Sequence, residues 1–180
     1  MKLALFIIAL LSSLIFGSCN SDPTLQKYFV ENTENKNFIA VDISSNILNV
    51  DKAKLTTVQK EALQSFDKIN VLAFKLNDKN IVEFEKERAK VNLILRKPIY
   101  QQLMKFGSGK QGASVSYVET GGSINEFVFF ANKKDVGFAV VRVLGKDMYP
   151  TNVMNMISVL KESKIDLEQL KPLQELIEKK

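Results

Sequence analysis

The sequence contains no histidine and no tryptophan, and Cys19 is its only cysteine. Without His or a second Cys, zinc, haem and iron–sulfur sites lose their usual ligands. The triads and dyads of nucleophilic enzymes that use His or Cys are excluded for the same reason. A disulfide within the chain is excluded too, because it needs two thiols. We therefore predict no metal site, no cofactor and no catalytic residues.

The most apolar stretch of the chain is its N-terminal leader. Lys2 supplies one positive charge, and residues 3–16 are apolar except for two serines. This run of 14 residues is shorter than the roughly 20 that cross a membrane as a helix. A charged start, a short apolar core and small residues at the exit are typical of a secretory signal peptide. The sequence thus predicts a cleavable signal helix over residues 1–18.

Cys19 follows this leader directly. The run Phe16-Gly17-Ser18-Cys19 resembles a bacterial lipobox, in which Leu usually stands in place of Phe16. The resemblance implies that the Cys19 thiol receives a diacylglyceryl group and that cleavage then makes Cys19 the first residue. Several acyl chains anchor a protein stably, whereas one chain gives only marginal membrane binding. An ordinary signal peptide with an incidental cysteine, or a retained N-terminal membrane helix, remain as alternatives.

The mature chain has the size of one domain. Removing residues 1–18 leaves 162 of the 180 residues, enough to bury a core without cross-links. We divide it into the lipidated cysteine and a short tether (19–24), a single domain (25–162) and a C-terminal helical extension (163–180). The five residues after Cys19 reach at most about 17 Å when extended. The domain is therefore expected to sit close to the leaflet.

Charges of both signs alternate along the chain. Lys and Arg total 25 against 20 acids, and basic and acidic residues are interleaved in stretches such as 83–88. Such interleaving is typical of a solvated face, whereas nucleic-acid binding requires a basic stripe with aromatic residues. We expect no nucleic-acid partner. The expected partners are the membrane, through the lipid on Cys19, and an envelope protein.

Residue patterns predict helices and strands in the first half of the chain. Thr24 fits the start of a helix over 25–32, and Thr56 with Gln59 fits a capping box at the start of a second helix. Apolar runs at 38–43 and 69–76 predict strands. A charged helix is expected over 81–97. Pro98, followed by apolar residues at helical spacing, predicts a further helix over 98–106.

The second half of the chain is predicted to be mostly strands. Runs at 113–117, 124–131 and 136–144 are joined by short loops, which favours an antiparallel meander. Apolar residues at helical spacing predict helices over 150–160 and 166–179, with Pro172 interrupting the second. The expected fold class is α+β: two layers, about five mostly antiparallel strands with a meander in the C-terminal half, and helices packed on one face.

The stretch Gly107-Ser108-Gly109-Lys110-Gln111-Gly112 invites comparison with a phosphate-binding loop. Such a loop runs from a strand into a helix, whereas here a predicted helix precedes and a predicted strand follows. We interpret it instead as a helix C-cap glycine and a connector. Ser108 and Lys110 also offer a Ser–Lys pair for a small hydrolase. Paired carboxylates are a second hydrolase option, and the best-spaced pair, Glu83 and Glu87, is predicted to be solvated.

Two side chains are weak candidates for ligand contact. Arg142 interrupts an apolar strand, where a desolvated guanidinium can bind a carboxylate or phosphate; an outward-facing Arg142 that covers the sheet with its stem is the alternative. Asp42 lies near the C-terminal end of a buried strand and can act as an acid or a ligand. Its alternative role is to cap the turn at Ser44 and Ser45.

Three segments carry a resemblance to a known family. Residues 38–44, 103–109 and 137–145 resemble a domain-of-unknown-function family of Bacteroidota putative lipoproteins. The resemblance implies a lipid-anchored envelope protein and carries over no active site. It also suggests a link to envelope-stress or sigma-factor signalling. Together with Asn20 and the few acids after Cys19, it favours the outer membrane, facing the periplasm.

The main functional hypothesis is a lipid-anchored, non-enzymatic binding or interaction module of the cell envelope. The alternatives are a small hydrolase that uses carboxylates or a Ser–Lys pair, and an accessory lipoprotein of envelope-stress signalling.

Overall fold

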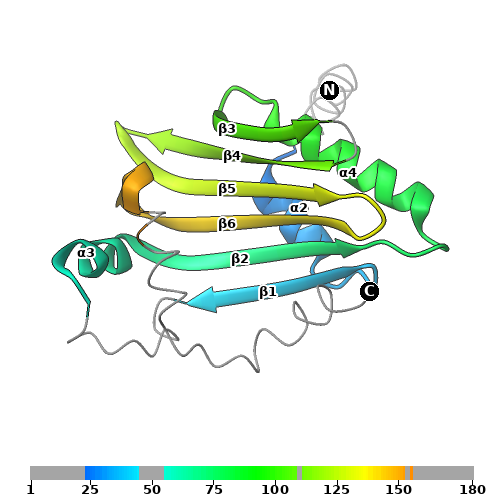
Figure 1. The fold of residues 1–180 in the computed structure, drawn as a ribbon, viewed down its shortest axis with the longest axis horizontal. Helices are drawn as coiled ribbons and strands as arrows, with labels where there is room; N and C mark the ends of the chain where they lie inside the picture. Colours follow the sequence, from blue (N-terminus) through cyan, green and yellow to red (C-terminus); the bar gives the residue numbers. More distant parts are fainter. Residues whose placement is uncertain (1–22, 45–54, 109–110, 153–154, 156–180) are drawn as a thin grey trace, which may run out of the picture.

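The computed structural model describes residues 23–44, 55–108, 111–152 and 155 (Figure 1). The predicted signal helix, Cys19 and most of the predicted tether lie outside the described residues. So do most of the predicted helix over 150–160 and all of the extension over 163–180. Within the described part of the chain, no helix has the length and apolar character needed to cross a membrane.

The centre of the fold is an antiparallel sheet of six strands in the order β1-β2-β6-β5-β4-β3. Strands β3 to β6 form a meander, and β6 then pairs with β2. The predicted α+β class and the meander in the C-terminal half are confirmed. The strands are β1 (Phe38–Ser44), β2 (Phe66–Lys75), β3 (Gln101–Ser108), β4 (Gln111–Thr120), β5 (Ser123–Lys133) and β6 (Gly137–Met148).

Two helices, α2 (Leu25–Asn32) and α4 (Ile81–Leu95), cover one face of the sheet, while α3 (Thr57–Ser65) lies at one end (Figure 1). Their predicted starts are confirmed. The Thr24 hydroxyl accepts a hydrogen bond from the Lys27 amide at 3.2 Å. At α3 the Gln59 amide donates to the Thr56 hydroxyl at 3.2 Å, and the Thr56 amide donates to the Gln59 side chain at 2.9 Å. Two backbone donors at the start of α3 are thereby satisfied.

The predicted helix over 98–106 is wrong, because residues 101–108 form β3. The register of β3 against β4 shifts between Gln102 and Met104, which inserts Leu103 as an extra residue. A bulge of this kind interrupts the alternation of apolar and polar residues that identifies a strand. The resulting spacing of Leu103, Met104 and Phe106 imitates a helix. The sheet therefore has six strands where about five were expected.

The glycine-rich stretch is a connector, as predicted, but the predicted helix C-cap is wrong for the same reason. It connects β3 to β4, so Gly107 is not a helix C-cap and no helix follows to receive a phosphate. Gly107 pairs with Gly112 and has φ of +70°. A Cβ atom at Gly107 would lie 2.5 Å from the Gln111 carbonyl oxygen. The glycine thus permits the tight closure of this hairpin.

The core between the helices and the sheet is rich in aromatic rings. Phe74 and Phe138 stack at 5.5 Å between ring centroids, and Phe38 meets Phe74 edge-on at 5.0 Å. Phe84 brings α4 into this cluster, with its ring centroid 5.8 Å from that of Phe74. Phe74 is fully buried. These contacts fix the position of α4 over the sheet.

Candidate functional site

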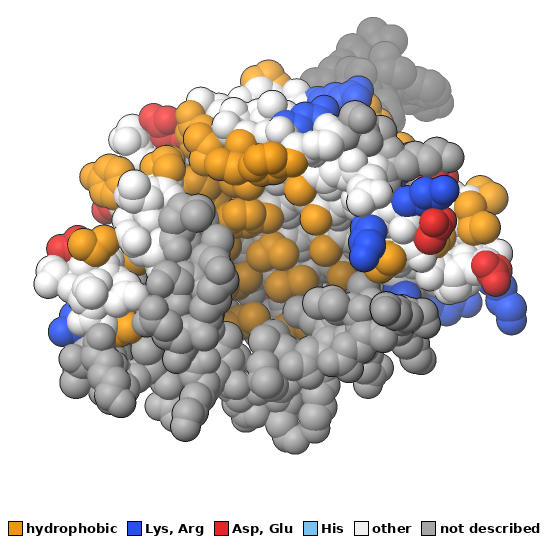
Figure 2. All heavy atoms as spheres, in the orientation of Figure 1, with side chains coloured by type: hydrophobic (Ala, Val, Ile, Leu, Met, Phe, Trp, Pro, Cys, Tyr) orange, Lys and Arg blue, Asp and Glu red, His pale blue; other side chains and the backbone are white. Residues whose placement is uncertain are grey.

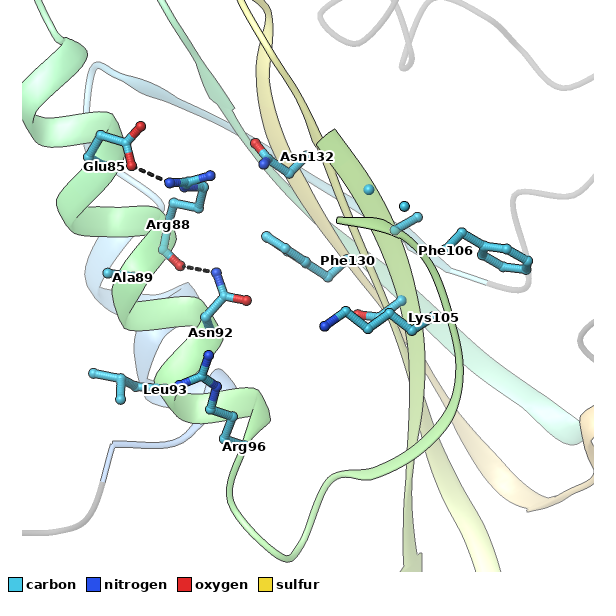
Figure 3. Close-up of a pocket in the computed structure, with 14 residues that line it drawn as sticks. Glu85, Arg88, Ala89, Asn92, Leu93, Arg96, Lys105, Phe106, Phe130 and Asn132 are labelled. Carbon is cyan, nitrogen blue, oxygen red and sulfur yellow. Dashed lines mark hydrogen bonds and ion pairs between the residues drawn. The ribbon is translucent and has the colours of Figure 1, made fainter. Parts of the chain in front are cut away.

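A cleft of about 600 Å³ lies between α4 and the hairpin formed by β3 and β4 (Figure 3). One wall is the C-terminal half of α4, and the other is the helix-facing side of the sheet. Lys105, Ser114 and Phe130 occupy neighbouring positions in one row across β3, β4 and β5. The row presents an amine, a hydroxyl and an aromatic ring to the same space.

Three cations stand around this cleft. Arg88 and Arg96 come from α4 and Lys105 from β3. In Figure 3 the Arg88 guanidinium points from the helix toward the sheet, and the Lys105 amine points from the hairpin toward the helix. Among the described residues that line the cleft, Glu85 is the one acid, and it forms an ion pair with Arg88. The side chains that line the cleft therefore carry a net positive charge.

The floor of the cleft is apolar. Phe130 is buried, and Leu93 of α4, which also lines the cleft, exposes 63% of its surface. Asn92 and Asn132 add amide groups at the two sides. The ring of Phe106 points away from α4, toward the other side of the hairpin (Figure 3). Cations around an apolar floor suit a ligand that combines an anionic group with an apolar body.

Arg142 is buried beneath α2. Only 4% of its surface is exposed, so it does not face outward. Its guanidinium donates to the Glu126 carboxylate from Nε at 2.6 Å and from Nη2 at 3.2 Å. Nη1 donates to the Gln26 side chain at 2.6 Å, and the Phe29 ring centroid lies 5.4 Å from the guanidinium carbon. The carboxylate that Arg142 binds therefore belongs to its own chain.

Asp42 lies in the same row as Arg142, with Asn70 between them. Its carboxylate accepts a hydrogen bond from the Asn70 amide. Asp42 and Arg142 both line a small pocket of about 190 Å³ under α2. The sheet thus brings the two predicted candidates together. The hydrogen-bond donors of Arg142 are directed at Glu126 and Gln26. The cleft beside α4 is larger and offers more space for a ligand.

The predicted solvated position of Glu87 is wrong. Only 5% of Glu87 is exposed, and its carboxylate accepts a hydrogen bond from Lys90 at 2.6 Å. Burial, together with the charge of Glu87, raises the pKa of the Tyr28 phenol well above its ordinary value. Glu83 lies apart and accepts a hydrogen bond from Asn37 at 2.7 Å. The two carboxylates therefore have different hydrogen-bond partners.

The fold and its two pockets can now be set against known proteins. A family model described as a domain of unknown function (DUF4252) matches residues 28–156. The chain belongs to the DUF4252 family. No curated protein and no solved structure matches it. The predicted membership of a domain-of-unknown-function family is confirmed. The matched range includes every described strand together with α3 and α4, so the cleft and the Arg142–Glu126 pair lie within the family domain, whereas Gln26 precedes it.

The cleft was not predicted from the sequence, because β3, which forms one of its walls, was expected to be a helix. Arg88, Asn92 and Arg96 recur every four residues on α4, which places them on one helix face. That spacing was available from the sequence. The position of Lys105 at the cleft could not be predicted, since residues 98–106 were expected to be helical. Among the described residues, no group of three or more Asp, Glu, His or Cys side chains is arranged to hold a metal ion.

Proposed function

We propose that this DUF4252 protein is a lipid-anchored, non-enzymatic binding module of a bacterial envelope, and that the cleft between α4 and the β3–β4 hairpin holds its ligand. The observation that carries the proposal is the set of cations around an apolar floor, Arg88, Arg96 and Lys105 about Phe130. The lipobox-like leader supports attachment through Cys19. The Bacteroidota origin and the outer-membrane, periplasm-facing location follow from the leader and the resemblance described above.

The ligand class follows from the chemistry of the cleft. An anionic group is drawn to Lys105 and Arg96, which stand on opposite walls and are exposed. An apolar body fits against Phe130. A cleft of about 600 Å³ lies within the range of small-molecule sites, roughly 300–1,000 Å³. We therefore propose an amphiphilic carboxylate or similar monoanion as the ligand.

The cleft is tested with decanoate, whose single carboxylate and apolar chain represent this class. In an NMR titration, decanoate should shift amide signals of α4, β3 and β4. Lys105→Glu should weaken the affinity by a factor of ten or more, since a hydrogen bond to a charged group contributes about 1.5–3 kcal/mol. Lys86→Glu is the matched control, because it makes the same charge change at an exposed position of α4 outside the cleft.

Phosphate and decanol, titrated separately, should each bind more weakly than decanoate. The proposal for the cleft is wrong if decanoate shifts amide signals outside α4, β3 and β4 instead of those within them. It is also wrong if Lys86→Glu and Lys105→Glu weaken binding equally, which would indicate attraction by net charge alone.

The anchor is tested in cells of a bacterium that processes lipoproteins. Cys19→Ala should abolish labelling by an alkyne-tagged fatty acid, because the thiol that accepts the lipid is lost. The leader, whose cleavage follows lipidation, should then also remain on the chain. Ser18→Ala keeps a small residue before the cysteine and should remain labelled. Persistent labelling of the Cys19→Ala protein would refute lipid attachment at this residue.

A further inference from the structure

The sheet has a second face, opposite α2 and α4, that is almost entirely apolar. Residues paired across neighbouring strands lie on the same side of a sheet, so the strand register defines three rows across this second face. The first row contains Ile39, Ala73, Ala139, Ala131, Ala113 and Phe106. The second contains Val41, Val71, Val141, Phe129, Val115 and Met104. The third contains Ile43, Ile69, Val143, Phe127, Tyr117 and Gln101.

An antiparallel sheet with one solvated face normally alternates apolar and polar residues along each strand. This sheet places its polar residues on the other side, beneath the helices, where Asn70, Arg142 and Ser116 are all buried. On the second face Gln101 is the polar member of the three rows, and its side chain accepts a hydrogen bond from the Tyr117 hydroxyl at 2.8 Å. The residue pattern is thus that of a sheet with both faces covered.

The size of the second face makes exposure to water costly. Six strands about 4.8 Å apart give a width of about 24 Å, and three rows of alternate residues extend about 13 Å along the strands. The product is on the order of 300 Å², the range above which monomers rarely leave an apolar patch exposed. Figure 2 looks onto this face and shows apolar side chains gathered over the middle of the sheet. At the β3 edge, Phe106 exposes 60% and Met104 40% of its surface.

The described chain leaves the sheet at one end of this same face. Met148, the last residue of β6, is buried in the cluster of apolar residues that belongs to the second face. Leu63 of α3 packs against the same cluster. The Asn152 side chain then donates a hydrogen bond to the Ser65 hydroxyl at 3.2 Å. Whatever follows residue 155 therefore starts beside the second face.

The sequence that follows carries two apolar stripes at helical spacing. The first contains Val153, Met154, Ile157 and Leu160, and the second Leu167, Leu170, Leu173 and Ile177. A helix over 150–160 would be about 16 Å long, and the helical segment over 166–179, which Pro172 interrupts, at most about 21 Å. Two helices packed side by side are 8–10 Å apart. Such a pair has the length and the width of the three rows.

We propose that residues 153–179 pack across the second face as two short helices, so that the sheet lies between two helical layers. The charged residues of the second stripe's helix, such as Glu168 and Glu175, would then face water. A second copy of the chain stacked on the same face would leave both stripes without an apolar surface to cover. The inference is independent of lipid attachment and of the ligand proposed for the cleft.

The test measures how accessible methyl groups are to a soluble gadolinium chelate. The protein is the chain from residue 19 with Cys19→Ser, which keeps every other residue of the mature sequence. Val71 and Val141 report on the second face. Their neighbours Leu72 and Val140 lie on the helix-covered side of the same strands and are fully buried. In the unmodified chain we expect the relaxation enhancement of Val71 and Val141 to be as small as that of Leu72 and Val140.

The double variant Leu170→Lys and Leu173→Lys should raise the enhancement at Val71 and Val141 several-fold and leave Leu72 and Val140 unchanged. The matched control, Glu168→Lys and Glu175→Lys, alters the charge more but lies on the polar side of the predicted helix and should have no effect. The proposal is overturned if Val71 and Val141 are strongly enhanced in the unmodified chain. Protection that disappears on dilution would assign the face to a second copy and would overturn it as well.

Discussion

Replacing Glu126 with leucine should lower the free energy of unfolding by about 3–5 kcal/mol. The change leaves the Arg142 guanidinium, with 5% of its side chain exposed, without the carboxylate that receives two of its hydrogen bonds. The cation then keeps its hydrogen bond to Gln26 and its contact with Phe29 but has lost its hydration and its counter-ion, which is costly for a buried charge. The measurement is the midpoint and slope of urea unfolding, followed by circular dichroism.

The double variant Glu126→Leu and Arg142→Met should recover most of the lost free energy of unfolding. It removes both charges and keeps a long apolar stem beside Phe29. The surface pair Lys27 and Glu31, 3.9 Å apart with both side chains at least half exposed, is the control. Glu31→Gln should change the free energy of unfolding by less than about 0.5 kcal/mol. A Glu126→Leu loss as small as this would show that the buried pair does not stabilise the fold.

The position of Arg142 shows which part of the sheet was predictable. Its strand was identified from a run of apolar residues, but such a run does not say which face a polar residue occupies. Partners on other elements decide that question, and Glu126 and Gln26 lie 16 and 116 residues away in sequence. The same holds for β4. Ser116 is 3% exposed beneath the helices, while Ala113, Val115 and Tyr117 lie on the second face.

Predictions were reliable for features that depend on residues close together in the sequence. The caps at Thr24 and Thr56 depend on side-chain and backbone groups within three residues, and both were predicted. The candidate cleft depends on β3, where the bulge at Leu103 breaks the strand pattern and Pro98 suggests a helix. Lys105 could be placed opposite Arg96 only once β3 was paired with β4. The cleft could therefore be found only from the structure, although the face of α4 that forms its other wall could be predicted from the sequence.

Gly137→Ala should be about as damaging as the loss of Glu126. Gly137 has φ of +141° and pairs with Lys75 at the end of the central β2–β6 ladder. An added Cβ atom would lie 2.0 Å from the Phe74 carbonyl oxygen. A backbone conformation that only glycine adopts readily costs a substituted residue about 1–3 kcal/mol, and overpacking adds about 1–3 kcal/mol. The free energy of unfolding should therefore fall by about 2–6 kcal/mol, measured by urea unfolding.

Gly122→Ala separates the two causes. Gly122 lies in the turn between β4 and β5 with φ of +84°, and an added Cβ atom there meets nothing within 4 Å. It carries the conformational cost alone, about 1–2 kcal/mol. The difference between the two variants then measures the close approach of β6 to the Phe74 carbonyl. Equal losses would mean that the strands separate at little cost, in which case the β2–β6 junction would not be the rigid centre that holds Phe74 and Phe138 beneath α4.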